Sequence, residues 1–298
     1  MTWDELFQRF SASRRLSPAT VTGYLRDWAL FLLQFPALQG PQDVAEHHLA
    51  EFYRGQLRNP KVSRNTAGQR LRSLLVILGW AQRQGHLLVN PGQFLHIKKP
   101  SRAIPRILTR DEVQGLLEAP LMASRYFVRY RDRAILELLY GTGMRKGEIV
   151  ALDLLDLDLA EALLKIRGGK GRPRYLPLSS EVVAALDRYL KEAWPAVALD
   201  GQTAVFVSLS GQRITGTNLG AQLSGYGERL GIPDVTAHAF RRAMATHMLE
   251  NGASLPELKA LLGHEDIAST QAYAQVVPAE MLREHRRYHP RAHRRRVL

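Results

Sequence analysis

Apolar residues in the first hundred positions recur at the three- and four-residue spacing that is typical of amphipathic helices. A first helix is predicted from Ser17, a suitable N-cap, through Pro18 at the first helical position to Pro36. Its apolar positions are rich in aromatic residues: Val21, Tyr24, Leu25, Trp28, Phe31, Leu32 and Phe35. Two more helices are predicted over residues 43–57 and 65–84. The amino-terminal part of the chain is therefore expected to be all helical.

Arginines accompany the apolar stripe of the third predicted helix. The stripe comprises Leu71, Leu74, Leu75 and Leu78, and the arginines are Arg64, Arg70, Arg72 and Arg83. Two interpretations fit these side chains equally well, contact with a DNA backbone or a solvated helix face. We assign Arg64, Arg70 and Arg72 as candidate DNA contacts within a helical domain of residues 1–96.

The helical pattern stops at residues 97–108, which contain two prolines, four basic residues and no clear period. Because proline disfavours helix in the residue before it, this stretch is predicted to be an interdomain linker. The next element begins with Thr109 and Glu112, which form a T-x-x-E capping box. A second domain is predicted over residues 109–282, followed by a basic tail of residues 283–298.

The second domain combines helical and strand patterns. Helices are predicted over residues 133–140, 146–152, 238–251 and 254–262. Two short β-like runs, residues 163–167 and 174–178, enclose a glycine-rich loop and predict a hairpin. The expected fold class is mainly α with a small antiparallel β-sheet (α+β).

Six residues of this domain have side chains suited to holding and cutting a phosphodiester. They are Arg145, Lys170, His238, Arg241, His264 and Tyr273. Guanidinium groups grip phosphate oxygens in pairs and favour a transition state with charge spread over those oxygens. A hydroxyl aimed at the phosphorus can attack it covalently.

The local sequence places several of these side chains where an anion would bind. Gly143 precedes Arg145 in a predicted turn, and Glu148 follows three residues later, where a carboxylate can orient a basic side chain. His238 and Arg241 share a face in the first turn of a predicted helix, whose amino end carries partial positive charge. His247 lies elsewhere on that helix and is interpreted as structural.

Four phrases surround the six residues in a fixed order. They are YGTGMRKGEI, GGKGRPRYLPL, HAFRRAMATHMLENGA and ALLGHEDIASTQAYAQV. Together they resemble the tyrosine recombinase (phage integrase) family, in particular its Xer-type branch of site-specific recombinases. The resemblance implies a helical core DNA-binding domain at residues 1–96 and a mixed catalytic domain at 109–282. It also implies that Lys170 is the general acid and Tyr273 the nucleophile.

The activity implied by the resemblance is site-specific DNA recombination without metal, ATP or another cofactor. Tyr273 would attack the scissile phosphate and form a 3′-phosphotyrosyl link, which a 5′ hydroxyl then reverses. The partner would be double-stranded DNA, with a homo- or hetero-tetramer assembled on two sites. The Xer-like phrasing favours chromosome dimer resolution, a task in chromosome partition and cell division.

Several alternatives remain open at this point. The same residues would serve a phage or mobile-element integrase or a type IB topoisomerase. A metal-dependent nuclease would need clustered carboxylates, for which Asp153, Asp156 and Asp158 are the nearest candidates, although they fit a polar turn and strand edge. A non-catalytic DNA-binding regulator would leave the six residues unexplained. Tyr288 is a second, weaker candidate nucleophile.

Three arginines of the second domain are further candidate DNA contacts, namely Arg172, Arg174 and Arg242. Arg242 stands where many relatives carry a second His after H-x-x-R, and we expect altered packing or phosphate contact there. The arginine-rich tail also departs from the apolar docking segment that the resemblance implies, so its regulatory role is left open.

Charge and composition agree with these expectations. The net charge of +13 divides into about +8 for residues 1–105, −1 for 106–282 and +6 for 283–298. Basic ends around a near-neutral middle are typical of a catalytic body with polyanion-binding regions. The chain has no cysteine, no apolar stretch of membrane-spanning length and no signal-peptide pattern at its start. A cytoplasmic, nucleoid-associated protein without membrane partners is expected.

Overall fold

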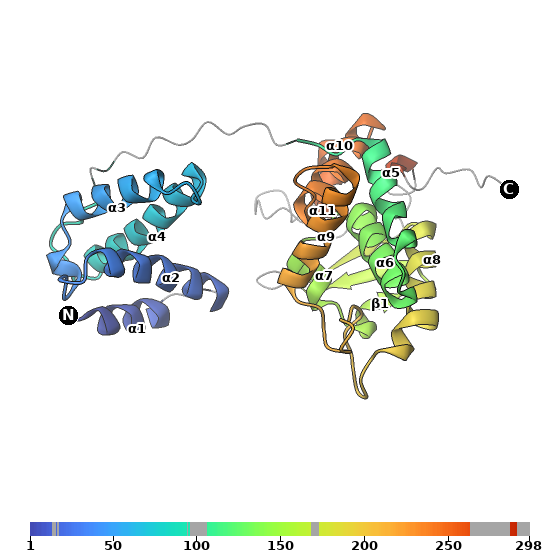
Figure 1. Ribbon diagram of the computed structural model, residues 1–298, viewed down its shortest axis with the longest axis horizontal. Coiled ribbons are helices and arrows are strands. Elements are labelled where there is room, and N and C mark those ends of the chain that lie inside the picture. The colour runs from blue at the N-terminus through green and yellow to red at the C-terminus, as the bar shows by residue number, and fades with distance from the viewer. Residues whose placement is uncertain are drawn as a thin grey trace. The chain divides into compact units, whose positions relative to one another are not determined.

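The computed structural model describes residues 1–13, 16, 18–93, 95, 106–167, 173–262 and 287–290. The chain divides into two compact units, Met1–Ile104 and Pro105–Leu298, each with its own hydrophobic core (Figure 1). Among the described residues, no helix combines the length and apolar character needed to span a bilayer.

The amino-terminal unit is helical. Its elements are α1 (Trp3–Ser13), α2 (Pro18–Gln34), the 3-10 helix η1 (Pro41–Asp43), α3 (Glu46–Arg58) and α4 (Arg64–Arg83). Ser63 caps α4 because its side chain accepts a hydrogen bond from the Thr66 amide at 3.0 Å. The three predicted helices are present within a few residues of their expected bounds, whereas α1 was not predicted.

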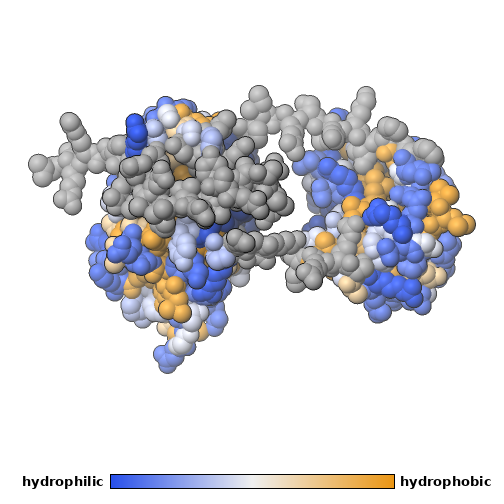
Figure 2. Space-filling model, turned by 180° about the vertical axis from the view of Figure 1, so that it is seen from behind, coloured by the Kyte–Doolittle hydropathy of each residue, from blue (hydrophilic) through white to orange (hydrophobic). Residues whose placement is uncertain are grey.

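Aromatic rings fill the core of this unit. Trp28 and Phe31 of α2 are fully buried and stack edge to face, and Phe52 of α3 packs on Phe31 in the same way. Phe10 of α1 is buried against Trp80 of α4. Hydrophilic residues dominate the outer surface that faces the viewer in Figure 2, with apolar residues in scattered patches. The aromatic stripe read from the sequence is therefore a packing surface.

The carboxy-terminal unit is built from helices around a small sheet. The helices are α5 (Arg110–Glu118), α6 (Tyr126–Thr142), α7 (Lys146–Ala151), α8 (Ser180–Arg188), α9 (Gly216–Leu230), α10 (Ala237–Glu250) and α11 (Leu255–Leu262). Short helical turns are η2 (Ala119–Met122), η3 (Leu154–Asp156), the π-helix η4 (Tyr189–Ala193) and η5 (Trp194–Ala196). The capping box of Thr109 and Glu112 opens α5 as predicted.

The sheet has three antiparallel strands in the order β1-β2-β3: β1 (Leu157–Asp158), β2 (Leu163–Ile166) and β3 (Arg174–Pro177). In the β2–β3 pair, Leu164 faces Leu176 and Ile166 faces Arg174. This pair is the predicted hairpin. With the helices around it, the sheet confirms the expected fold class, mainly α with a small antiparallel sheet.

Helix α6 is the central element of this unit, and it packs against both α8 and α10 (Figure 1). It begins at Tyr126, seven residues before the predicted start at Arg133. The longer helix is explained by its buried face, which includes Phe127 and the charged pair Arg131 and Asp132. The sequence pattern shows only the apolar second half, so the prediction of the start was wrong.

Candidate active site

Arg145 lies in the turn between α6 and α7. Gly143 ends α6 in the left-handed conformation, with φ of 63°. This backbone conformation favours glycine, and a side chain here would also press on the ends of the Met244 and Leu262 side chains. Arg145 then serves as the N-cap residue of α7, with a half-exposed side chain. The two ends of these helices thus present one guanidinium at the surface.

Glu148 holds Arg145 in place through two contacts. Its carboxylate accepts the Arg145 backbone N–H at 2.8 Å and the Arg145 Nη1 at 3.1 Å. Burial raises the pKa of Glu148, but the backbone hydrogen bond and the charges of Arg174 and Arg145 outweigh burial and bring the pKa below its usual value. Glu148 is therefore an ionised carboxylate that orients the arginine.

Arg174 reaches the same carboxylate from the first position of β3. Its Nη2 donates to Glu148 Oε1 at 2.9 Å, and its side chain is only 23% exposed. The sequence suggested an outer DNA contact for this residue, whereas the structure brings it to the Arg145–Glu148 pair. Arg174, 26 residues after Glu148, thus shares this carboxylate with Arg145.

Arg241 is the buried guanidinium of the group. It lies in the first turns of α10 and is 7% exposed. Its Nη1 donates to the Gly143 carbonyl at 2.8 Å and its Nη2 to the Leu262 carbonyl at 2.7 Å. Two backbone acceptors from separate elements therefore fix the plane of this group next to the turn that carries Arg145.

The electrostatics of the cluster favour an anion. Burial, followed by the charge of Arg145, lowers the pKa of Arg241 to about 10. Arg174 acts in the same direction, while Glu148 opposes the shift. Three guanidinium groups thus face one carboxylate, and the unbalanced positive charge is partly desolvated. A phosphate between these groups would relieve the repulsion and accept their N–H groups in pairs.

His238 is exposed in the first turn of α10, where Thr236 is the N-cap and accepts the Ala239 N–H at 3.1 Å. It precedes Arg241 by three residues, so both belong to the amino end of one helix. Lys170, Arg172, His264 and Tyr273 lie outside the described residues. In sequence, Lys170 stands between the last residue of β2, Ile166, and the first residue of β3, Arg174.

Comparisons with known proteins identify the family. The model of the phage integrase family matches residues 106–280, more than half of the chain. The chain belongs to the phage integrase family. A tyrosine recombinase XerC of Pelotomaculum thermopropionicum is 31% identical to it over 97% of this chain and 98% of the relative. A XerD of Xanthomonas axonopodis pv. citri is 30% identical, with 97% of each chain covered.

Solved structures share the integrase fold. The Tn1549 transposon integrase, solved in complex with circular intermediate DNA, superposes with a TM-score of 0.71 at 20% identity and covers 95% of this chain and 98% of its own. The XerH recombinase bound to its palindromic difH substrate gives a TM-score of 0.69 at 19% identity, covering 93% of this chain and 82% of its own. At such identities the likeness concerns the fold alone.

The candidate DNA-contacting arginines of this integrase-family chain have different surroundings. Arg64 and Arg72 are exposed on α4, and the Arg72 Nε donates to the Gly68 carbonyl at 3.1 Å. Arg70 is half-buried and bonded to Gln56 of α3. Arg242 donates from Nη2 to the Arg106 carbonyl at 3.4 Å. Of the four, Arg64 and Arg72 present the most accessible charge.

The aspartates considered for a metal site are engaged by arginines. Arg167 contacts both Asp153 and Asp156 at 2.7 Å, and Arg213 pairs with Asp153. Asp158 accepts the backbone N–H of Glu161 at 3.0 Å. Within the described ranges, no three His, Cys, Asp or Glu side chains gather in a group that could hold a metal ion.

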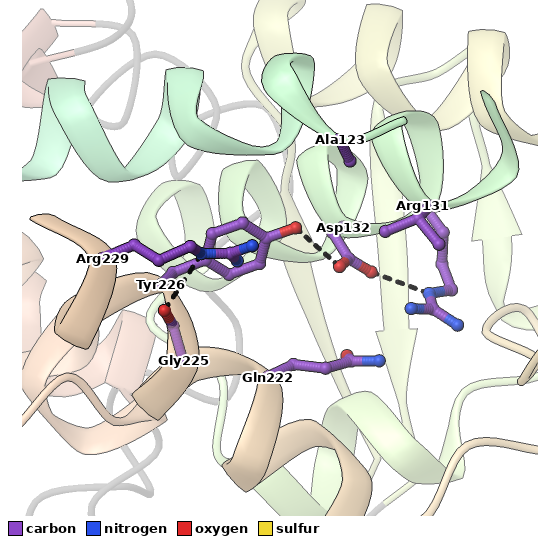
Figure 3. Close-up of a pocket in the computed structure, with 8 residues that line it drawn as sticks. Ala123, Arg131, Asp132, Gln222, Gly225, Tyr226 and Arg229 are labelled. Atoms are coloured by element: carbon purple, nitrogen blue, oxygen red, sulfur yellow. Dashed lines mark hydrogen bonds and ion pairs between the residues drawn. The ribbon is translucent and has the colours of Figure 1, made fainter. Parts of the chain in front are cut away.

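A pocket of about 420 Å³ lies beside the first half of α6, whereas Arg145 follows the end of that helix. Figure 3 shows residues that line the pocket. Asp132 is central to it and accepts from Arg131 Nε at 2.7 Å and from the Tyr226 hydroxyl at 2.8 Å. Arg229 of α9 lies over the Tyr226 ring. These contacts join α6 to α9, and the pocket contains none of the six candidate residues.

Proposed function

We propose that this protein is a site-specific tyrosine recombinase that cuts and rejoins DNA strands, with Xer-like chromosome dimer resolution as its task. The observation that carries the proposal is the cluster of Arg145, Arg174 and Arg241 around Glu148. Its position within the family match and the XerC and XerD names of relatives similar over nearly the whole chain support the same function.

The proposed reaction begins with a phosphate held by Arg145, Arg241 and His264. The Tyr273 oxygen attacks the phosphorus, the bond from phosphorus to the 5′ oxygen breaks, and a 3′-phosphotyrosyl link forms. Lys170 gives a proton to the departing 5′ oxygen, because an alkoxide is a poor leaving group, and His238 assists transfer of the phenol proton away from Tyr273. Glu148 keeps Arg145 aligned throughout. Arg174 adds charge to the phosphate-binding group.

The reverse step restores DNA without an external energy source. The covalent link conserves the energy of the broken bond, so a 5′ hydroxyl from a second strand attacks it and releases Tyr273. This chemistry requires neither a metal ion nor ATP. Exchange between two duplexes needs four active sites, which implies a homo- or hetero-tetramer on two DNA sites. Such work places the protein on the nucleoid in the cytoplasm.

In this proposal the two units have different roles, DNA binding and catalysis. The helical domain of residues 1–96 binds the core DNA site through its basic surface, and the linker of residues 97–108 connects it to the catalytic domain of 109–282. The exposed arginines Arg64 and Arg72 support this assignment, as does the positive charge of the first hundred residues. The basic tail of residues 283–298 adds charge at the other end.

A nicked suicide substrate tests the proposal. Duplexes that bind the protein are selected from a random pool and given a nick close to the cleavage position, so that the 5′ fragment diffuses away after cutting. We expect a covalent protein–DNA adduct on a denaturing gel with the wild type, in the presence of EDTA and without ATP. Tyr273→Phe should form none. If that variant still formed an adduct, another residue would be the nucleophile. Tyr288→Phe would then be the next variant to examine.

Paired sites separate recombination from strand relaxation. A type IB topoisomerase rejoins each strand to its own partner, whereas a recombinase joins strands from two duplexes. With two differently labelled copies of the selected site, we expect hybrid products that carry both labels. Relaxation of supercoiled DNA without hybrid products would favour the topoisomerase, and hybrids formed only between two dissimilar sites would favour a mobile-element integrase.

A further inference from the structure

Residues 287–290, in the first half of the basic tail, lie against the core of the carboxy-terminal unit (Figure 1). His289 is completely buried, although it stands in one of the most arginine-rich stretches of the chain. Tyr288 is partly buried and packs against the same core, with the Arg287 guanidinium over its ring. A histidine that is fully buried requires a specific partner for its ring nitrogens.

The partner of His289 is the end of α6. Its Nε2 lies 3.1 Å from the Tyr140 carbonyl, and because a carbonyl can only accept, this nitrogen carries the proton. The two rings meet edge to face with centroids 5.3 Å apart. The last carbonyls of a helix cannot all be satisfied by its own N–H groups, so a donor from elsewhere stabilises the helix end. His289 supplies such a donor to the carbonyl of Tyr140, which stands five residues before Arg145.

A second contact fixes the tail to α10. Asn251, the C-cap residue of α10, donates from Nδ2 to the Tyr288 carbonyl at 2.8 Å. The Asn251 Oδ1 accepts from Arg110 Nη2 of α5 at 2.9 Å, so its amide bridges α5 and the tail. Tyr140 itself is joined to α10 through its hydroxyl, which lies 2.9 Å from His247 Nδ1. Tyr288 and His289 therefore contact the ends of α10 and α6: α10 carries His238 and Arg241, and α6 leads into the turn of Arg145.

From these contacts we infer that His289 is a positioning residue, which caps the end of α6 and thereby holds the turn that presents Arg145. The inference rests on the proposed function, in which Arg145 holds the phosphate. His289 and Asn251 act through these elements and do not touch the DNA.

Two truncated chains give a matched test. A chain ending at Pro290 keeps the anchor and loses four arginines, whereas one ending at Arg286 also loses residues 287–290. Adduct formation on the suicide substrate is measured at saturating DNA, so that affinity does not enter. We expect the first chain to cut at the wild-type rate and the second to cut at least tenfold more slowly. Equal rates for the two chains would overturn the inference.

Point variants separate positioning from folding. His289→Ala should slow adduct formation about tenfold, with the DNA dissociation constant changed less than twofold. His289→Gln keeps a side-chain N–H donor and should recover part of the rate. Amide hydrogen exchange over residues 139–147, measured without DNA, should accelerate in the Ala variant and less in the Gln variant. Unchanged exchange, or a Gln variant as slow as the Ala variant, would contradict the capping role.

The same experiments distinguish failure of the inference from failure of the proposed function. If the wild type forms no adduct on any selected site, the recombinase proposal fails, while the exchange measurement still tests the cap on α6. If the wild type cuts and His289→Ala cuts equally fast, the recombinase proposal stands and the positioning role is refuted.

Discussion

The two units of this protein handle polar groups in opposite ways. Among the described residues of the amino-terminal unit, the buried polar side chains are Asp27 and Ser73, in a core otherwise made of aromatic and aliphatic groups. The described part of the carboxy-terminal unit buries Arg131, Asp132, Glu137, Thr142, Asp156, Ser179, Arg241, His247 and His289. Both units are rich in arginine, but the first keeps its arginines at or near the surface.

This difference shows where geometry has to be fixed. Burying a charge costs several kcal/mol unless a partner and hydrogen bonds compensate. Among the described charged side chains of the amino-terminal unit, the Asp27 carboxylate alone is buried, and Ser73 donates to it. Under the proposed function this unit supplies a basic surface for DNA, a task for which an aromatic core is sufficient. A phosphate-binding group, in contrast, needs guanidinium planes held to within a fraction of an ångström. Arg241, tied to two carbonyls, meets that need at the cost of a depressed pKa.

The largest effect is expected from Arg241→Ala. The change removes a phosphate donor and leaves the Gly143 and Leu262 carbonyls without this partner. We expect adduct formation at saturating DNA to fall by about 1,000-fold. Arg241→Lys keeps the charge but not the planar fork, so most of the loss should persist. Arg188→Ala, a change at an exposed arginine of the same unit, is the control. Cutting by Arg241→Ala within tenfold of the wild-type rate would show that this arginine does not hold the phosphate.

Glu148→Gln should have the next largest effect. The amide keeps the shape of the side chain but removes the counter-charge that Arg145 and Arg174 share. We expect adduct formation to fall about 10- to 100-fold, as for residues that orient a catalytic group. Glu161→Gln, at an exposed site in the same unit, should cut like the wild type.

The pH dependence of stability sharpens this prediction. The pKa of Glu148 in the fold lies below its unfolded value of 4.5, so the ionised group stabilises the protein fully above that pH. This stabilisation is lost as the pH falls through the lower, folded pKa. Chemical unfolding of wild type and Glu148→Gln should therefore differ at pH 7 and converge in acid. A difference that stayed constant from pH 7 to pH 3 would mean that the carboxylate charge is not responsible.

In the amino-terminal unit, the double change Arg64→Gln and Arg72→Gln should weaken DNA binding without slowing the chemical step. Each lost phosphate contact lowers the slope of log affinity against log salt by about 0.9. We expect roughly a tenfold loss of affinity at moderate salt, a slope reduced by about 2, and an unchanged adduct rate at saturation. Arg9→Gln, at an exposed arginine of α1, shows the effect of removing one positive charge elsewhere in the unit, which should be less than half of that of the double change. An unchanged salt slope would mean that both arginines belong to a solvated helix face and do not contact DNA.

The sequence predicted local structure well where one stretch of chain determines it. The capping box before α5, the β2–β3 hairpin and the glycine turn before Arg145 all depend on neighbouring residues. Helix α1 also had a local signal, since Trp3, Leu6, Phe7 and Phe10 follow helical spacing, but it was not recognised. The local signal for helix α9 was weaker, because its four glycines disfavour helix. Burial of Leu219 and Leu223 compensates for the unfavourable helix propensity of these glycines.

Contacts between distant residues could not be predicted in the same way. Nothing in the local sequence of Arg174 indicates that it shares Glu148 with Arg145, because the hairpin brings it there through strand pairing. His289 likewise stands in a stretch whose composition favours solvent, and only the end of α6 explains its burial. The family is therefore readable from sequence phrases, while the contacts of Arg145, Glu148, Arg174 and Arg241 depend on tertiary packing.

The smallest effect concerns the one buried polar pair described in the amino-terminal unit. The Ser73 hydroxyl donates to Asp27 Oδ2 at 2.7 Å, which links α4 to α2. Ser73→Ala leaves this buried carboxylate oxygen without the donor, and we expect the unit to lose about 1–3 kcal/mol of stability. Because the pair serves packing, the adduct rate at saturating DNA should not change. Ser224→Ala, at an exposed serine of the other unit, should cost less than about 0.5 kcal/mol. If Ser73→Ala slowed cutting as much as it destabilised the protein, polar burial in the first unit would also serve the chemistry, and the contrast between the two units would fail.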